Sequence, residues 1–72
     1  MNTKIFINLG RNIKKYRLKK DLTQDQLAEK INVHQTYIGK LETGKINPSV
    51  KRLFLITRAL EITFVDLFDF DK

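Results

Sequence analysis

The sequence predicts an all-α fold in which five short helices pack as one compact domain over residues 1–72. Three observations lead to this fold class. Apolar residues recur three and four positions apart, the spacing of one face of a helix. Only three glycines and one proline interrupt the chain, which leaves segments of helical length joined by short loops. The 72 residues also suffice for one small hydrophobic core.

The first two helices are indicated by apolar spacing and by a capping signal. The apolar positions of the first are Ile5, Leu9, Ile13 and Tyr16. We expect this helix to end near Lys20. Thr23, followed by Gln26 three residues later, has the sequence of a capping box, in which each side chain bonds to the other residue's backbone N–H. A second, short helix is therefore expected over residues 24–31.

A tight turn and a third helix follow. Asn32 is a residue type that adopts the left-handed conformation of a turn without large strain. Gly44 stands where a glycine commonly follows the end of a helix. These two residues delimit a third helix over residues 35–43, with Ile38 and Leu41 on its inner face.

Start signals predict two more helices. Pro48 and Ser49 are typical of a helix N-terminus, and the apolar pattern of the fourth helix continues to Leu60. Thr63 is placed to cap a short fifth helix that ends near Phe68. Five helices then account for the whole length without a long loop.

The charge is distributed unevenly. The formal net charge is +6, with +9 over residues 1–60 and −3 over residues 61–72. A basic body on a small domain is typical of nucleic-acid binding, because each neutralised phosphate releases condensed counterions. A solvated lysine-rich surface has the same composition, so the positions of the charges must decide.

The composition argues against several other classes. The chain has no cysteine, which excludes disulfides and thiolate zinc sites, and its single histidine, His34, disfavours any metal site. No apolar run is long enough to span a membrane, so we expect a cytoplasmic protein without a cofactor. The carboxylates are dispersed, and neither a Ser-His-Asp arrangement nor a glycine-rich phosphate loop occurs. An enzyme is therefore not expected.

Two short helices joined by a tight turn suggest a helix-turn-helix. Ala28 is small enough to let the second and third helices cross closely. The polar side chains of the third helix point outward, and these are Gln35, Thr36, Tyr37 and Lys40. Such a face is free to enter the major groove of DNA.

Four stretches carry a family resemblance: LGRNIKKYR (residues 9–17), LTQDQLA (22–28), YIGKLETG (37–44) and NPS (47–49). Together they resemble the lambda-repressor-like (Cro or XRE type) helix-turn-helix proteins over nearly the whole chain. The length and the run Thr36-Tyr37-Ile38 also resemble the controller proteins of restriction–modification systems. The resemblance implies a transcriptional regulator that binds double-stranded DNA as a homodimer, each third helix reading half of a two-fold symmetric operator.

The resemblance also assigns site residues. It places Gln35, Thr36 and Lys40 at base-reading positions, where Gln can pair with adenine, Lys with guanine and the Thr methyl with a thymine methyl; the alternative is a solvated helix face. It places Gln24 at a phosphate and pairs Arg17 with Glu42 in a structural ion pair. Further phosphate contacts are expected at Tyr37, Thr43, Lys45, Asn47, Lys51 and Arg52. For Tyr37, partial packing against the core is an equal alternative.

Three residues depart from the family pattern. His34 stands where Ser or Thr usually caps the third helix, which is the recognition helix that reads DNA. Imidazole is a poorer cap, so the sequence does not fix the residue at which this helix begins. Asn32 replaces the usual glycine of the turn. Gly39 lies in mid-helix at a cost of ~1 kcal/mol relative to Ala. Either the helix approaches DNA very closely at Gly39, or the position is simply permissive.

The carboxy-terminal end is a candidate dimer interface. Five helices cannot bury all the aromatic residues, and we expect Val65, Phe68 and Phe70 to face a second copy. Phe68 is expected to close the core in part together with Leu67, which leaves Val65 and Phe70 as the more exposed pair. The neighbouring acidic residues could contact RNA polymerase or simply increase solubility.

Other functions of the same fold stay open at this stage. An antitoxin of a toxin–antitoxin pair would need a toxin-binding segment, and no obvious tail supplies one. A protein-interaction module or an RNA-associated bridging domain could use the same fold, since fold does not fix function. Preference for one duplex over random duplex would separate a DNA reader from these modules. The sequence does not distinguish repression from activation.

Overall fold

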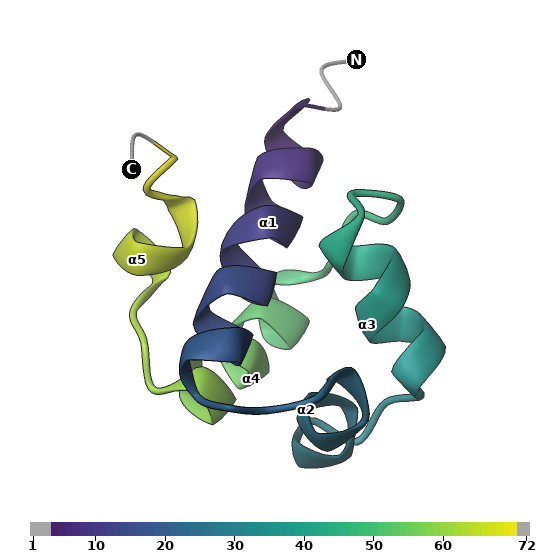
Figure 1. Ribbon diagram of the computed structural model, residues 1–72. Coiled ribbons are helices and arrows are strands. Elements are labelled where there is room, and N and C mark those ends of the chain that lie inside the picture. Colours follow the sequence, from purple (N-terminus) through teal and green to yellow (C-terminus); the bar gives the residue numbers. More distant parts are fainter. Residues whose placement is uncertain (1–3, 71–72) are drawn as a thin grey trace.

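The computed structural model describes residues 4–70, and that range contains five helices and no strand (Figure 1). The helices are α1 (Lys4–Lys19), α2 (Gln24–Lys30), α3 (Gln35–Glu42), α4 (Val50–Leu60) and α5 (Phe64–Phe68). The predicted all-α, five-helix fold is confirmed. The first helix, α1, packs against α3, α4 and α5. In the view of Figure 1, α3 and α5 lie on opposite sides of α1.

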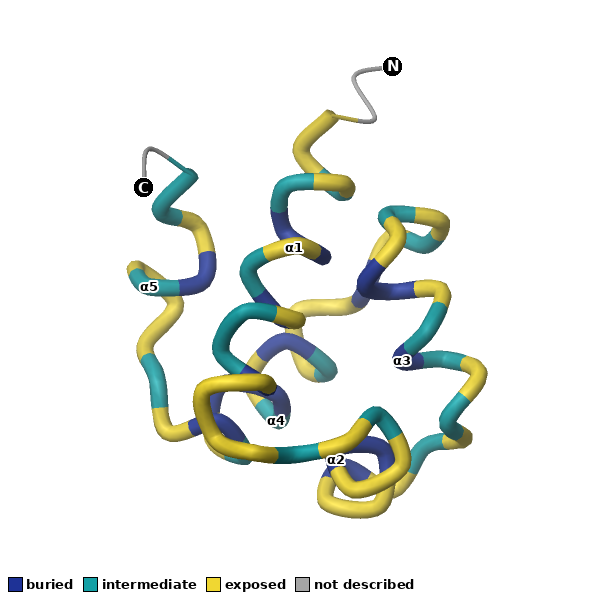
Figure 2. Tube along the Cα trace, viewed as in Figure 1, coloured by how far each residue is buried: buried dark blue, intermediate teal, exposed yellow. Residues whose placement is uncertain are grey.

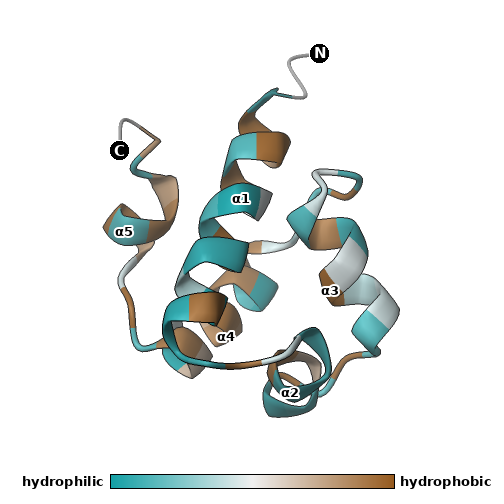
Figure 3. Ribbon diagram, in the orientation of Figure 1, coloured by the Kyte–Doolittle hydropathy of each residue, from teal (hydrophilic) through white to brown (hydrophobic). Residues whose placement is uncertain are grey.

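Every helix contributes a fully buried aliphatic side chain to one core (Figure 2). These side chains are Ile13, Leu27, Ile38, Leu41, Ile56, Leu60 and Leu67. Burial of one such side chain contributes roughly 1.5–3 kcal/mol. Hydrophilic residues cover much of α1 and α2 (Figure 3), as the amphipathic pattern of the sequence requires.

Side chains cap the N-termini of α2, α4 and α5. Thr23 Oγ1 accepts a hydrogen bond from the Gln26 N–H at 3.0 Å, and Gln26 Oε1 accepts one from the Thr23 N–H at 2.9 Å. The predicted capping box is therefore confirmed. Ser49 caps α4 and Thr63 caps α5, also as predicted. Asp66 completes a second capping box with Thr63, which the sequence pattern had not indicated.

Residues in the left-handed conformation follow four of the helices. They are Asp21, Asn32, Gly44 and Glu61, with φ angles of 58°, 60°, 77° and 58°. The conformations of Asn32 and Gly44 confirm the sequence prediction. The helices that precede these two residues, α2 and α3, end at Lys30 and Glu42, one residue earlier than expected.

Gly10 sets the distance between α1 and α3. A Cβ atom at this position would lie 2.4 Å from the carbonyl oxygen of Leu41 and 2.7 Å from that of Glu42. Atoms do not approach one another so closely, so any side chain here would push α3 away from α1. The sequence had indicated Gly10 only as an interruption of the chain, because the contact joins segments far apart in sequence.

Candidate nucleic-acid interface

The second and third helices form the predicted helix-turn-helix. Ala28 is 2% exposed where α2 packs against α3, so a small side chain is needed there. On α3, Ile38 and Leu41 are buried, whereas Thr36 and Lys40 are exposed. The recognition helix therefore has one face in the core and one face open to a ligand.

His34 caps the recognition helix. Its Nδ1 atom accepts a hydrogen bond from the Thr36 N–H at 3.1 Å and lies 2.9 Å from the Thr36 hydroxyl oxygen. The histidine thus replaces the usual Ser or Thr cap, and α3 begins at Gln35 as predicted. Because the Thr36 hydroxyl is bonded to His34, the methyl group of Thr36 is the part left for a base contact.

A polar network ties the recognition helix to the rest of the fold, and we define it as Arg17, Glu42, Gln24 and Gln35. Arg17 Nε lies 2.6 Å from Glu42 Oε2, and Arg17 Nη2 lies 3.0 Å from Glu42 Oε1. The two side chains are only 7% and 2% exposed. This buried, bidentate ion pair joins α1 to the end of α3, the arrangement that the family resemblance implied for these residues.

The network continues to the outer face of α3. Gln24 Nε2 donates to Glu42 Oε1 at 3.0 Å, and Gln35 Nε2 donates to Gln24 Oε1 at 2.6 Å. The side-chain amide of Gln24 is therefore bonded within the protein through its oxygen and one N–H, which leaves its second N–H for the expected phosphate contact. The bond from Gln35 to Gln24 orients Gln35, whereas at the N-terminus of α2 the Gln26 N–H is already bonded to Thr23.

The predicted base-reading residues lie together. Gln35, Thr36, Gly39, Lys40, Thr43 and Lys45 line a shallow groove of about 310 Å³ along α3. A Cβ atom at Gly39 would meet only Gln24 Oε1, at 3.8 Å, so packing within the protein does not require glycine here. The two alternatives from the sequence therefore both stand: close approach of a ligand at Gly39, or a position that is simply permissive.

Of the residues expected at phosphates, Thr43 and Lys45 line this groove themselves. Lys45, Asn47 and Lys51 are exposed. Arg52 is partly buried, with its guanidinium 4.9 Å from the ring centroid of Tyr37, which itself packs partly against the core. Thr43 Oγ1 donates to the carbonyl oxygens of Gly39 and Lys40, so its hydroxyl hydrogen is already engaged.

The carboxy-terminal aromatics are arranged differently from the expectation. Phe68 is 41% exposed, whereas Phe70 packs against the core with its ring centroid 6.1 Å from that of Phe68. The expected roles of these two side chains are thus reversed. Val65 is 77% exposed, as anticipated, and Phe64 and Phe54 are 40% and 47% exposed. Neither was assigned to the dimer surface from the sequence; Arg58 of the same helix lies over the Phe54 ring, 5.6 Å from its centroid.

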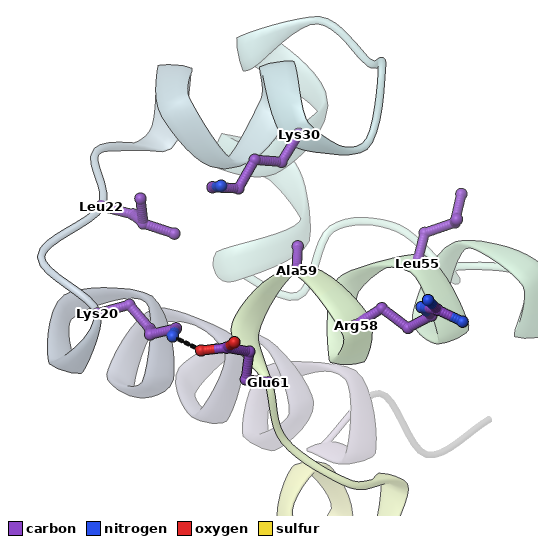
Figure 4. Close-up of a pocket in the computed structure, with 7 residues that line it drawn as sticks. All are labelled: Lys20, Leu22, Lys30, Leu55, Arg58, Ala59 and Glu61. Atoms are coloured by element: carbon purple, nitrogen blue, oxygen red, sulfur yellow. Dashed lines mark hydrogen bonds and ion pairs between the residues drawn. The ribbon is translucent and has the colours of Figure 1, made fainter.

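A second hollow, of about 630 Å³, lies between α2 and α4 (Figure 4). Its lining consists of Lys20, Leu22, Lys30, Leu55, Arg58, Ala59 and Glu61. Its one carboxylate, that of Glu61, is paired with Lys20. Residues 4–70 hold no group of three His, Cys, Asp or Glu side chains that could bind a metal ion. No helix in the same range is long and apolar enough to cross a membrane.

The chain matches the model of a known protein family. The helix-turn-helix family HTH_3, of the Cro/C1 (XRE) type, matches residues 13–67, which include all of α2, α3 and α4. The chain belongs to this family. It is accordingly a helix-turn-helix transcriptional regulator, and its family is not one of enzymes.

Relatives of this HTH_3 chain match it over most of their own length. An uncharacterized HTH-type transcriptional regulator of Archaeoglobus fulgidus is 40% identical over 60 residues, covering 83% of this chain and 84% of that protein. The control protein C.MunI of a Mycoplasma species is 40% identical over 70 residues, covering 94% and 95%. A solved structure of the restriction-modification controller protein C.Esp1396I, a tetramer bound to its natural 35 base-pair operator, matches with a TM-score of 0.79 and 38% identity over 90% of this chain and 86% of that one.

Proposed function

We propose that this HTH_3 protein binds a two-fold symmetric operator as a homodimer and regulates transcription from it in the cytoplasm. The observation that carries this proposal is the open face of α3, on which Gln35, Thr36 and Lys40 line one groove while Arg17 and Glu42 anchor the helix from behind. The likeness to C.Esp1396I, whose structure contains operator DNA, supports the same orientation of α3.

Base reading follows from the chemistry of the groove. Gln35 is held by Gln24 through one end of its amide, which leaves its carbonyl oxygen and second N–H for the bidentate pattern of adenine. Lys40 is exposed and can donate to the O6 and N7 acceptors of guanine. Because Gly39 has no side chain, the backbone of α3 can approach the base edges closely.

Phosphate contacts then fix the register. Lys45, Asn47 and Lys51 lie on the loop after α3 and on the first turn of α4, where they flank the groove. Arg52 is held against the Tyr37 ring, so it presents its charge from a fixed position. Such contacts strengthen binding to any sequence and give it a salt dependence.

Dimerisation is supported by exposed apolar side chains on α4 and α5. Phe54, Phe64, Val65 and Phe68 are each between 40% and 77% exposed. A second copy that covers these apolar side chains would remove them from water, which favours association. One recognition helix contacts only a few base pairs, so two half-sites about one helical turn apart supply the discrimination.

A narrower role as a restriction–modification controller is supported by the likeness to C.MunI, which extends over 94% of the chain. In that role the acidic residues 61–72 are the surface we assign to RNA polymerase. DNase footprinting on the DNA beside the coding gene tests the whole proposal. Protection of two half-sites with related sequences is expected, and uniform or absent protection would contradict it.

A further inference from the structure

Asn12 connects α1 to α5. Its Nδ2 atom donates hydrogen bonds to the carbonyl oxygen of Leu67 at 2.8 Å and to that of Asp69 at 3.1 Å. A side-chain amide has two hydrogens on this nitrogen, and here each of them serves one carbonyl. Because both neighbours can only accept, the NH₂ end of the amide must face α5.

These two bonds compensate for the shortness of α5. A helix of five residues is far too short to be stable alone, and its last carbonyl groups have no partner within the helix. At its start, the side chains of Thr63 and Asp66 each accept a hydrogen bond from the other residue's N–H, and Leu67 attaches it to the core. Asn12 supplies bonds to the carbonyl oxygens of Leu67 in the helix and Asp69 just after it, from 55 and 57 residues away in sequence.

Helix α1, which carries Asn12, also holds the recognition helix α3. Arg17, which bonds to Glu42 at the end of α3, is five residues beyond Asn12, or about 7.5 Å along α1. Since α3 and α5 lie on opposite sides of α1 in Figure 1, this single helix carries the reading surface on one side and the candidate dimer surface on the other. Any movement of α5 on α1 would therefore change the separation of the two recognition helices in a dimer.

We propose that Asn12 is the positioning residue that fixes α5 relative to the recognition helix, so that it sets the half-site spacing that the dimer accepts. This inference rests on the proposed dimerisation through α5. It assigns to Asn12 a role in specificity without any contact to DNA.

The test uses two variants of Asn12 and a matched control in the full chain. N12D keeps the shape of the side chain but replaces the donor by a carboxylate, which repels the two carbonyl oxygens; N12A removes the donor without adding charge. Asn8 lies one turn earlier on α1 and lines the same surface hollow as Asn12, but among the described residues it has no hydrogen bond to α5. N8D therefore makes the same chemical change without breaking the connection.

Two measurements separate positioning from general stability. Sedimentation equilibrium gives the dimer Kd, and fluorescence anisotropy gives the affinity for a single half-site duplex and for operators whose half-site spacing changes in steps of one base pair. We expect N12D and N12A to raise the dimer Kd at least about tenfold and to flatten the spacing preference, while affinity for one half-site stays within about twofold. N8D should match the wild type.

The inference is overturned if N12D and N12A behave like N8D, or if they weaken half-site binding as much as operator binding. If N12D fails to fold, as judged by circular dichroism, N12A decides. A wild-type protein that is monomeric both free and on its operator would instead contradict the proposed dimer itself, before any variant is compared.

Discussion

The helix-turn-helix region, α2 and α3, and the carboxy-terminal region, α4 and α5, differ in the side-chain contacts that they make. Around α2 and α3, the network of Arg17, Glu42, Gln24 and Gln35 is joined by hydrogen bonds within the chain, which hold the recognition helix without any ligand. At α4 and α5 the outward side chains are largely apolar and exposed. The first region is held by polar contacts within one chain, whereas the second exposes apolar side chains, which is why we propose it as the dimer surface.

The largest expected effect comes from breaking the buried ion pair. Glu42→Ala leaves the buried Arg17 charge without its carboxylate, with only the carbonyl oxygen of Leu22 as a hydrogen-bond acceptor, so we expect the free energy of unfolding to fall by ~3–5 kcal/mol. The exposed pair of Lys20 and Glu61 is the matched control, and Lys20→Ala should change stability by no more than ~1 kcal/mol. Urea denaturation monitored by circular dichroism measures both values. Similar losses for both variants would mean that burial does not distinguish the two pairs.

Substitutions of Gly10 and Gly39 test two close approaches of α3, to α1 at Gly10 and to DNA at Gly39. Gly10→Ala places a methyl group against the backbone of α3 and should cost ~1–3 kcal/mol of stability. Gly39→Ala meets only Gln24 Oε1, at an ordinary contact distance of 3.8 Å, and should stabilise the free protein by up to ~1 kcal/mol. If α3 approaches DNA at Gly39, the second variant still binds its operator more weakly than the wild type. A Gly39→Ala protein that is more stable and equally tight on DNA would make the position merely permissive.

Substitutions on the outer face of α3 test base reading. Gln35→Ala or Lys40→Ala should cost ~1–3 kcal/mol of binding on the operator and little on random duplex. The reason is that these side chains are assigned to base edges, whereas random DNA is held through phosphates. Equal losses on both duplexes would remove the residue from the base-reading set.

Dimerisation through the carboxy-terminal end can be tested at a residue that is not part of the hydrophobic core. Val65 is 77% exposed, so Val65→Asp should leave the protein folded and raise its dimer Kd by at least about tenfold. Val50, 74% exposed at the start of α4, offers a matched control in Val50→Asp. Analytical ultracentrifugation compares the two. An unchanged dimer with Val65→Asp would place the interface elsewhere.

The smallest expected effect concerns a single phosphate contact. Lys51→Ala should weaken binding to every DNA sequence and lower the slope of log K against log salt by about one unit. Titrations at several salt concentrations give the slope. If the slope is unchanged, Lys51 faces solvent in the complex.

Local rules predicted the features that depend on a few neighbouring residues. The Thr23 capping box and the left-handed turns at Asn32 and Gly44 follow from residue types at fixed spacing. Contacts between distant segments were not predictable in this way. The bonds from Asn12 to α5 and the approach of Gly10 to α3 join residues more than 30 positions apart, so no local pattern indicates them.

The candidate site likewise has some features that local sequence predicts and others that depend on contacts between helices. The outward position of Thr36 and Lys40 follows from helical periodicity, but the engagement of Gln24 by Glu42 depends on how α2 meets α3. The reversed exposures of Phe68 and Phe70 have a similar cause. After α5 ends at Phe68 the chain turns back onto α1, where Asn12 holds the carbonyl of Asp69 and Phe70 packs against the core.

The central claim is that the open face of α3 reads a particular DNA sequence. The most direct test is an anisotropy titration of the wild-type protein, at one fixed salt concentration, against the footprinted operator and against a scrambled duplex of equal length and composition. The account predicts a preference for the operator of at least about a thousandfold. Equal affinity for the two duplexes, or no binding to either, would contradict it.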